Sequence, residues 1–199
     1  MITDGTVTDP DFEMASLRTL KAIHRCVDEK IALVQVREKL LSARRLFDLV
    51  SAAAKVTKGS ATRLLVNDRT DIALAAGADG VHLMTTSMPA KVVRQDFPRQ
   101  FIIGVSTHSS DEVRQAADDG ADFAVFGPVF ETPGKGQPKG LKKLADVCRA
   151  FEPFPVIGIG GIDGSNCESV VSAGASGIAA IRALGDSRSL QIIKAKLRQ

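Results

Sequence analysis

The sequence predicts an α/β protein built on a parallel sheet, and three observations favour a (β/α)8 barrel of the TIM type over residues 1–199 as a single domain. Short apolar, β-branched runs alternate with segments that have helical spacing. A five-residue, glycine-containing pattern recurs where helices should end. Polar or glycine-rich residues follow almost every predicted strand. With 199 residues the barrel would be short, and an open doubly wound sheet is the alternative, although no G-x-G-x-x-G follows its first strand.

Seven apolar runs predict seven strands, and Met-Ile-Thr at the start predicts the stub of a truncated first strand, which makes eight. The seven runs cover residues 31–36, 63–66, 80–83, 101–105, 123–126, 155–159 and 177–181. Helices are predicted between them from apolar residues at helical spacing. These residues are Leu17, Leu20, Ile23 and Val27; Leu46, Val50 and Ala54; Val113, Ala116 and Ala117; and, in a last helix over 187–198, Leu190, Ile193 and Leu197.

The recurring pattern reads AGADG at 76–80, DGADF at 119–123 and AGASG at 173–177. Each copy stands between a predicted helix and the next predicted strand. Glycine is the residue that most readily ends a helix in a left-handed conformation. The pattern therefore predicts repeated βα units.

Composition excludes several classes of function. The 26 basic and 23 acidic residues nearly balance, and Trp and Tyr are absent, so a nucleic-acid-binding protein is not expected. There is no run of eighteen apolar residues and no amino-terminal signal, which predicts a cytoplasmic protein without membrane association. Cys26, Cys148 and Cys167 lie far apart, which is typical of buried free thiols.

Polar side chains at the strand ends predict one binding site, because in a barrel the carboxyl ends of all strands converge. Arginine and lysine there would bind phosphate or diphosphate. For Arg37 and Lys39 the alternative is a surface ion pair with Glu38 or another neighbour. Gly160 and Gly161 fit a phosphate loop, and His82 and His108 could orient substrate or transfer protons. The full set of candidates is Gln35, Arg37, Lys39, Asn67, Asp68, His82, Ser106, His108, Thr132, Lys135, Gly160, Gly161, Ile181 and Arg182.

Asp68 is the candidate metal ligand. It follows Asn67 at a strand end, and magnesium commonly takes one or two carboxylates and completes its shell with water and substrate phosphate oxygens. The alternative is that Asp68 caps the following helix, a role that could also coexist with water-mediated metal binding. The long loop FETPGKGQPKG at 130–140 is either a mobile lid that carries Lys135 or an exposed insert.

With these motifs in order, the chain resembles the thiamine phosphate synthase/TenI superfamily over nearly its whole length. The resemblance is carried by ITD at 2–4, VQVREK at 34–39, LLVNDRTDIALAAGADGVHL at 64–83, IIGVSTHS at 102–109, GADFAVFGPVFETPGK at 120–135, PVIGIGGI at 155–162 and AGASGIAAI at 173–181. It implies a (β/α)8 barrel, a transferase of thiamine biosynthesis and a homo-oligomer. The implied reaction is magnesium-dependent coupling of hydroxymethylpyrimidine diphosphate with hydroxyethylthiazole phosphate, which gives thiamine phosphate and pyrophosphate.

The resemblance also implies roles for the candidate residues. Asp68 would bind magnesium, while Thr132, Gly161 and the backbone at Ile181 and Arg182 would hold the thiazole phosphate. The diphosphate would be held by Gln35, Arg37, Lys39, Asn67, Ser106 and Lys135, with Arg37, Lys39, Ser106 and Lys135 taken as catalytic.

Two positions bear on which member of the superfamily this is. In synthases the His-Leu/Ile pair that corresponds to residues 82–83 is commonly followed by Gly-Gln-Glu/Asp-Asp, whose last aspartate is a second magnesium ligand. This chain reads VHLMTTSMP there and has no carboxylate. The TenI tautomerases carry histidine in G-H-V-F, where this chain has Pro128. The alternatives to the synthase are therefore a TenI-like thiazole phosphate isomerase and a non-catalytic regulatory protein that binds a thiamine precursor.

Overall fold

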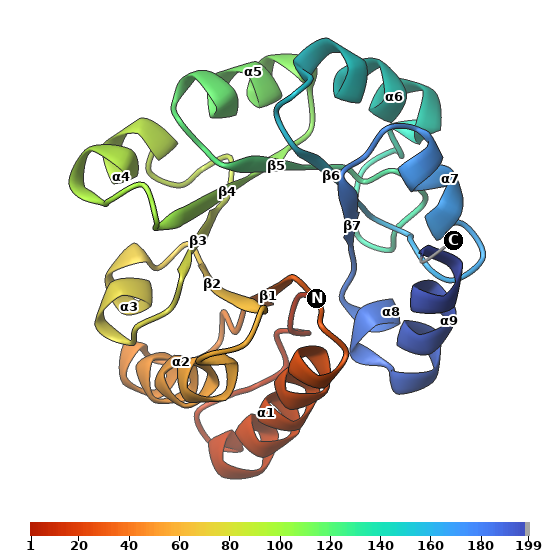
Figure 1. Cartoon of the computed structure of the whole chain (residues 1–199). Coiled ribbons are helices and arrows are strands. Elements are labelled where there is room, and N and C mark those ends of the chain that lie inside the picture. The colour runs from red at the N-terminus through yellow and green to blue at the C-terminus, as the bar shows by residue number, and fades with distance from the viewer. Residues whose placement is uncertain (198–199) are drawn as a thin grey trace. The chain divides into compact units, whose positions relative to one another are not determined.

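The computed structural model describes residues 1–197, in which strands and helices alternate along the chain (Figure 1). All the strands of this part belong to one seven-stranded sheet with the order β1-β2-β3-β4-β5-β6-β7. The strands are β1 (Leu33–Val36), β2 (Arg63–Asn67), β3 (Gly80–Leu83), β4 (Ile102–Thr107), β5 (Phe123–Phe126), β6 (Val156–Ile159) and β7 (Gly177–Ala179). The helices are α1 (Phe12–Asp28), α2 (Ala43–Thr57), α3 (Thr70–Ala75), α4 (Ala90–Asp96), α5 (Ser110–Asp118), α6 (Gly140–Phe151), α7 (Cys167–Ser172), α8 (Arg182–Gly185) and α9 (Ser187–Leu197).

The parallel α/β architecture is confirmed. Each of the seven predicted strands is present, with its ends within two residues of the prediction. Pairing is parallel, as in Val34 opposite Leu64 and Val66 opposite Val81. The predicted stub at residues 1–3 makes an isolated parallel bridge between Ile2 and Gln35 rather than a full strand.

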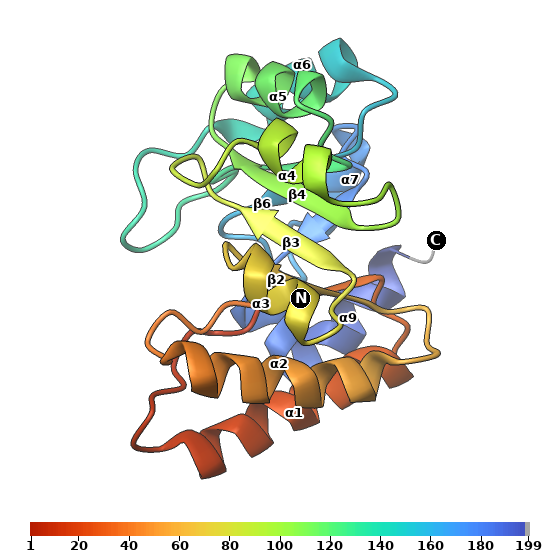
Figure 2. The ribbon, with the colours of Figure 1, turned by 90° about the vertical axis from the view of Figure 1, so that its left-hand side faces the viewer.

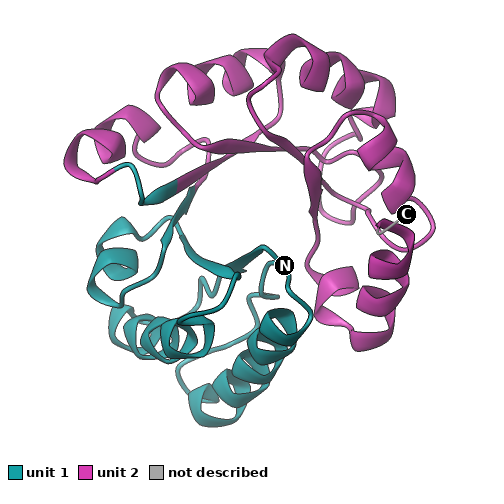
Figure 3. Ribbon diagram, viewed as in Figure 1, with its two compact units in different colours: residues 1–82, 99–102 teal, residues 83–98, 103–199 magenta. Residues whose placement is uncertain are grey.

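The chain divides into two compact units (Figure 3): residues 1–82 with 99–102, and residues 83–98 with 103–199. In the first unit the side chains of Ile23, Val34, Leu49 and Leu64 are fully buried between helices and strands. In the second unit the largest fully buried side chain is Phe126 of β5, accompanied by Leu144 of α6 and Leu190 of α9. The prediction of a single domain stays a prediction.

Apolar residues line one face of the longer helices, and a serine side chain caps the start of α2 and of α5. In α2, Leu46, Leu49 and Val50 are buried, and the Ser42 hydroxyl accepts a hydrogen bond from the Arg45 N–H. In α9 the predicted apolar face is buried at Leu190 and Ile193, whereas Leu197 is exposed; residue 198 of the predicted helix lies outside the described residues.

All three cysteines are free and buried, as predicted. Among residues 1–197, the helices are too short or too polar to cross a membrane.

The recurring AGADG pattern is a structural device that ends a helix and starts a strand. Gly77, Gly120 and Gly174 have φ of 73°, 79° and 95°, the left-handed conformation expected of a helix-ending glycine. Two residues later, Asp79 donates its N–H to the Leu64 carbonyl at 2.9 Å, and its carboxylate accepts the Leu64 N–H at 2.8 Å.

The second copy repeats this exchange. Asp122 donates its N–H to the Ile103 carbonyl at 2.8 Å and accepts the Ile103 N–H at 2.7 Å. The same carboxylate oxygen lies 2.6 Å from Nη2 of Arg94, whose side chain is 14% exposed. The pattern thus links each new strand to the strand before it.

We predict that Asp122→Ala destabilises the protein more than Asp79→Ala does. The first change leaves the Ile103 N–H and the largely buried Arg94 without the carboxylate, which should cost roughly 2–3 kcal/mol. The second change leaves the Leu64 N–H without its carboxylate acceptor. The partner cation Arg63 is 56% exposed and can be hydrated instead, so a loss of about 1 kcal/mol in the free energy of unfolding is expected. Urea denaturation measures both losses.

The control is Asp146→Ala, which removes only exposed ion pairs to Lys142 and Arg149 and should leave the free energy of unfolding nearly unchanged. Equal losses for Asp122→Ala and Asp146→Ala would show that the pattern does not contribute to stability in this way.

Candidate active site

Two amide side chains meet at the carboxyl ends of β1 and β2 in the first unit. Gln35 is 6% exposed, and its Nε2 donates to Oδ1 of Asn67 at 3.0 Å. The contact arises because β1 and β2 are parallel neighbours in register. It orients both amides, so the sequence prediction that these residues lie together is confirmed.

Arg37 follows immediately after β1 and is anchored through its backbone. Its N–H donates to Oγ1 of Thr3 at 2.8 Å. Among residues 1–197, the Arg37 guanidinium forms no ion pair with a carboxylate, and the Glu38 carboxylate instead accepts N–H groups from Gly5 and Val7. The alternative of a surface ion pair between Arg37 and Glu38 is therefore wrong. A cation in this state has its charge available for an anionic ligand.

Lys39 lies two residues further on, in the turn that leads toward α2, and its side chain is exposed. Because the strand ends at Val36, Arg37 and Lys39 both lie beyond the hydrogen-bonded part of β1. Strand alternation alone therefore does not determine their direction.

Asn67 and Asp68 end β2 beside His82 of β3. Asn67 is the register partner of His82, and the Asp68 N–H donates to the His82 carbonyl at 2.9 Å. Asp68 has φ of 63°, a left-handed conformation that is uncommon outside glycine and is tolerated by aspartate. Such conformations cluster at functional sites.

The helix-cap alternative for Asp68 is wrong. The residue at the N-cap of α3 is Arg69, and α3 has no side-chain cap hydrogen bond. Arg69 instead pairs with Asp71 through two hydrogen bonds of 2.9 and 2.6 Å.

His82 is a buried, neutral histidine. Its side chain is 4% exposed, and burial, together with the nearby positive charge of Arg37, lowers its pKa from 6.5 to about 4. At neutral pH the first unit therefore presents a cation, a neutral imidazole and two amides around the ends of β1, β2 and β3. The positive charge of Arg37 favours an anionic ligand there, and the neutral His82 adds no second positive charge.

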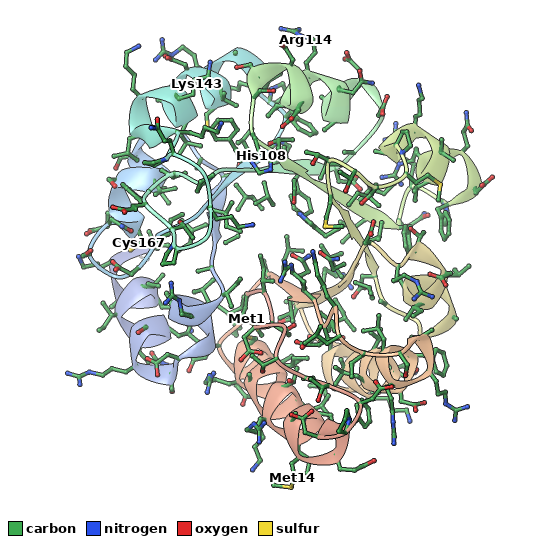
Figure 4. The ribbon with its side chains drawn as sticks, turned by 180° about the vertical axis from the view of Figure 1, so that it is seen from behind. Met1, Met14, His108, Arg114, Lys143 and Cys167 are labelled. Atoms are coloured by element: carbon green, nitrogen blue, oxygen red, sulfur yellow. The ribbon has the colours of Figure 1, made fainter. Side chains whose placement is uncertain are left out.

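In the second unit, β4 ends with Ser106 and Thr107, and His108 follows it. Thr107 is fully buried, and its hydroxyl donates to the Val125 carbonyl. Nδ1 of His108 lies 2.6 Å from the Gly127 carbonyl, and the His108 N–H donates to the Glu112 carboxylate. Figure 4 places His108 against the strands, whereas Arg114 and Lys143 project outward from α5 and α6. Because a carbonyl oxygen can only accept, Nδ1 of His108 is the donor in this contact.

The loop after β5 packs on the loop after β6, and this contact requires glycine at two positions. The Val129 N–H donates to the Ile159 carbonyl at 2.7 Å, and the Phe130 N–H to the Gly160 carbonyl at 3.0 Å. A Cβ at Gly160 would lie 2.5 Å from the Pro128 side chain, and one at Gly161 would lie 2.5 Å from the Glu131 carbonyl. Their φ values of 100° and 62° are also left-handed.

Thr132 and Lys135 lie in the loop that joins β5 to α6. Its neck is closed by bonds from the Lys139 N–H to the Pro128 carbonyl at 2.7 Å and from the Gly140 N–H to the Val129 carbonyl at 3.0 Å. Between them the loop projects beyond the strand ends (Figure 2), and Lys135 is exposed. Closed ends with an exposed middle are typical of a loop that can act as a lid.

Ile181 and Arg182 lie where β7 gives way to α8. Ile181 is the N-cap residue of α8, and its carbonyl accepts the Gly185 N–H at 3.0 Å. The Arg182 side chain is exposed.

The structure adds residues that were not singled out from the sequence. Thr3 and Glu38 organise the backbone around Arg37, and Asn166 donates from Nδ2 to the Gly161 carbonyl at 2.9 Å. Only the Asp-x-Ser-Asn cluster at 163–166 carried a local signal, because such residues commonly bond to nearby backbone.

The side chains at these strand ends limit how a metal ion could bind. Within residues 1–197, the structure has no group of three or more His, Cys, Asp or Glu side chains that could hold a metal ion. The candidate carboxylate is Asp68, which directly follows β2 and lies beside His82. This set does not fit an all-protein metal cage, but it fits a magnesium ion that keeps water and takes substrate oxygens.

We predict a pH dependence of stability that arises from His82. Its folded-state pKa lies below the ordinary value, so the unfolded chain binds a proton that the folded chain rejects between pH 4 and 6.5. Stability from this group is complete above 6.5 and is lost as the pH falls toward 4, by roughly 3 kcal/mol, since one pKa unit corresponds to about 1.4 kcal/mol. Urea denaturation across this range should show a flatter profile for His82→Gln; identical profiles would contradict a buried neutral His82.

Comparisons with known proteins identify the family of the chain. The family model described as thiamine monophosphate synthase matches residues 6–184. The thiamine-phosphate synthase of Moorella thermoacetica is 38% identical over 184 residues, covering 91% of this chain and 87% of that protein. That of Roseiflexus castenholzii is 43% identical over 154 residues, covering 76% and 67%. Among solved structures, thiamine phosphate pyrophosphorylase from Pyrococcus furiosus has a TM-score of 0.85 at 28% identity, covering 99% of this chain and 93% of that one. The chain therefore belongs to the thiamine monophosphate synthase family.

Proposed function

We propose that this protein is a thiamine phosphate synthase, a transferase that joins hydroxymethylpyrimidine diphosphate to hydroxyethylthiazole phosphate. Family membership supports the reaction. The observation that carries the proposal for this chain is the Arg37 guanidinium, which has no carboxylate partner among residues 1–197 and lies close enough to the buried His82 to lower its pKa. An uncompensated cation among oriented amides is the arrangement that an anionic leaving group requires.

The chemistry asks the protein to stabilise departing charge. The bond between the pyrimidine methylene carbon and the diphosphate oxygen breaks, its electron pair leaves with pyrophosphate, and the thiazole nitrogen lone pair forms the new carbon–nitrogen bond. Arg37 and Lys39 would neutralise the leaving oxygens, with Gln35 and Asn67 donating or accepting hydrogen bonds beside them. A neutral His82 carries no charge, so it would neither offset the charge of Arg37 and Lys39 nor compete with them for the leaving oxygens.

For the second unit, taken by itself, the family resemblance suggests further substrate-binding residues. Ser106 and the loop residue Lys135 would contact the diphosphate. Thr132, Gly161 and the backbone at Ile181 and Arg182 would hold the thiazole phosphate, because close backbone approach at glycine suits a phosphate. The Asn166 contact to the Gly161 carbonyl would keep this loop in place.

Magnesium is proposed as the metal, with Asp68 as its protein ligand. When bound, it would supply positive charge to the diphosphate oxygens. Synthases commonly carry a second aspartate five residues after the histidine that corresponds to His82. Here that position is Ser87, whose hydroxyl accepts the Met84 N–H at 2.7 Å. Water and substrate oxygens would fill the rest of the shell.

The finer description of the fold belongs to the proposal as well. The bridge at Ile2 is where the first of eight strands would lie, so a (β/α)8 barrel is retained as the expected fold. A homo-oligomer also stays a prediction, which sedimentation velocity would test.

The proposed function predicts a large effect of substitution at Arg37. The purified protein should form thiamine phosphate from the two substrates, and Arg37→Ala should lower kcat/KM for the diphosphate by about 100- to 1000-fold, since it removes a charge that stabilises the leaving group. The matched control is Arg44→Ala, which removes an arginine whose side chain is 83% exposed and should change little.

The outcomes separate the alternatives. No product from the wild type, beside an active control synthase, would overturn the synthase assignment. Isomerisation of a thiazole phosphate without magnesium would then indicate a TenI-like tautomerase, and binding of a thiamine precursor without turnover would indicate a regulatory protein.

The second prediction concerns Asp68. Asp68→Asn should raise the magnesium concentration needed for half-maximal rate by about tenfold or more, because one carboxylate ligand is lost. Asp71→Asn is the control, since Asp71 pairs with Arg69 on the exposed start of α3. An unchanged magnesium requirement in Asp68→Asn would place the metal elsewhere.

A further inference from the structure

Glu38 is a buried carboxylate between the two cations Arg37 and Lys39. Glu38 is 3% exposed, and its carboxylate forms no ion pair with a lysine or an arginine among residues 1–197. Its two oxygens accept backbone N–H groups, Oε1 from Gly5 at 3.3 Å and Oε2 from Val7 at 3.0 Å. Carboxylates are rarely buried without a cationic partner, because desolvation is unfavourable.

Its pKa reflects this balance. Burial raises the pKa of the Glu38 carboxyl, whereas hydrogen bonds from Thr3, Val7 and Gly5 oppose the rise. The backbone donors thus take the place of a counter-ion, which orders the chain that supplies them.

That chain, the segment of residues 3–7, encloses the backbone and side chain of Arg37. Oγ1 of Thr3 accepts the Arg37 N–H at 2.8 Å. Gly5 has φ of 77°, and a Cβ at Gly5 would lie 3.2 Å from the Arg37 carbonyl and 3.5 Å from its Nη1. The guanidinium therefore lies against the backbone that Glu38 holds.

We propose that Glu38 is a positioning residue: by binding the segment 3–7 it fixes Arg37 in the geometry that receives the diphosphate. It touches no substrate and acts through Thr3, Gly5 and Val7. The proposal rests on the diphosphate role of Arg37 given above.

Charge and position predict opposite effects, which makes the proposal testable. Glu38→Gln removes a negative charge next to an anion site, so electrostatics alone predicts tighter binding of pyrophosphate. A carboxamide has one acceptor oxygen instead of two, so it cannot hold both the Gly5 and the Val7 N–H in the same way. Positioning therefore predicts weaker binding.

The experiment measures inorganic pyrophosphate affinity by calorimetry in the presence of magnesium, and the KM of each substrate. For Glu38→Gln we expect about tenfold weaker pyrophosphate binding and a similar rise in the KM for the diphosphate, with the KM for the thiazole phosphate unchanged. Glu13→Gln makes the same charge change at a side chain that is 83% exposed and should leave all three values unchanged. Tighter or unchanged pyrophosphate binding in Glu38→Gln would overturn the proposal.

A double-mutant cycle tests whether Glu38 acts through Arg37. In an Arg37→Ala background, Glu38→Gln should weaken pyrophosphate binding by less than about twofold, because the residue being positioned is gone. A full tenfold loss in that background would show a general structural role and would contradict the proposal.

Thr3 provides a second arm should Glu38→Gln fail to fold. Thr3→Val removes the acceptor for the Arg37 N–H at similar volume, and should weaken pyrophosphate binding, whereas Thr3→Ser keeps the hydroxyl and should retain it. Equal affinities in these two variants would overturn the proposal. A wild type that turns over while Glu38 and Thr3 variants match it would reject only the positioning role; a wild type without turnover or pyrophosphate binding would reject the proposed function itself.

Discussion

Parallel alignment of neighbouring strands is the constraint on which the candidate site depends. In the first unit it puts the ends of β1, β2 and β3 at one edge, so that Gln35 reaches Asn67 and Asn67 lies opposite His82. In the second unit it places His108 beside Gly127 and the loop after β5 on Gly160. The AGADG pattern maintains that alignment. Asp79 and Asp122 each bind both the N–H and the carbonyl of one residue in the preceding strand, Leu64 and Ile103 respectively.

Much of the fold could be predicted because its signals are local. Seven apolar runs became seven strands, and the glycines of the repeated pattern took left-handed φ values. Strand ends were displaced by up to two residues, as at β7, which stops at Ala179 instead of continuing to residue 181. Whether a chain stays in the ladder at its end depends on tertiary hydrogen bonds, which apolar runs do not encode.

The proximity of Gln35, Asn67 and His82 could be predicted from the sequence, but the electrostatic state of His82 could not. That His82 is neutral follows from its burial and from Arg37, which lies far away in the sequence. Whether Asp68 is the N-cap residue of the following helix likewise needed the backbone, because the local sequence suited a cap and only the structure assigns the N-cap position to Arg69. Burial and charge proximity are long-range properties, and residue type alone does not determine them.

Glu38 illustrates why the remaining part of the site was missed. Alternation along Gln35, Arg37 and Lys39 made the intervening glutamate look like the ordinary partner of two surface cations. The strand, however, ends at Val36, and the residue is buried against amides from residues 5 and 7. A carboxylate satisfied by backbone N–H groups does not neutralise a neighbouring arginine, whereas one paired with that arginine does. The hydrogen bonds that bury Glu38 against residues 5 and 7 therefore leave the charge of Arg37 available for an anionic ligand.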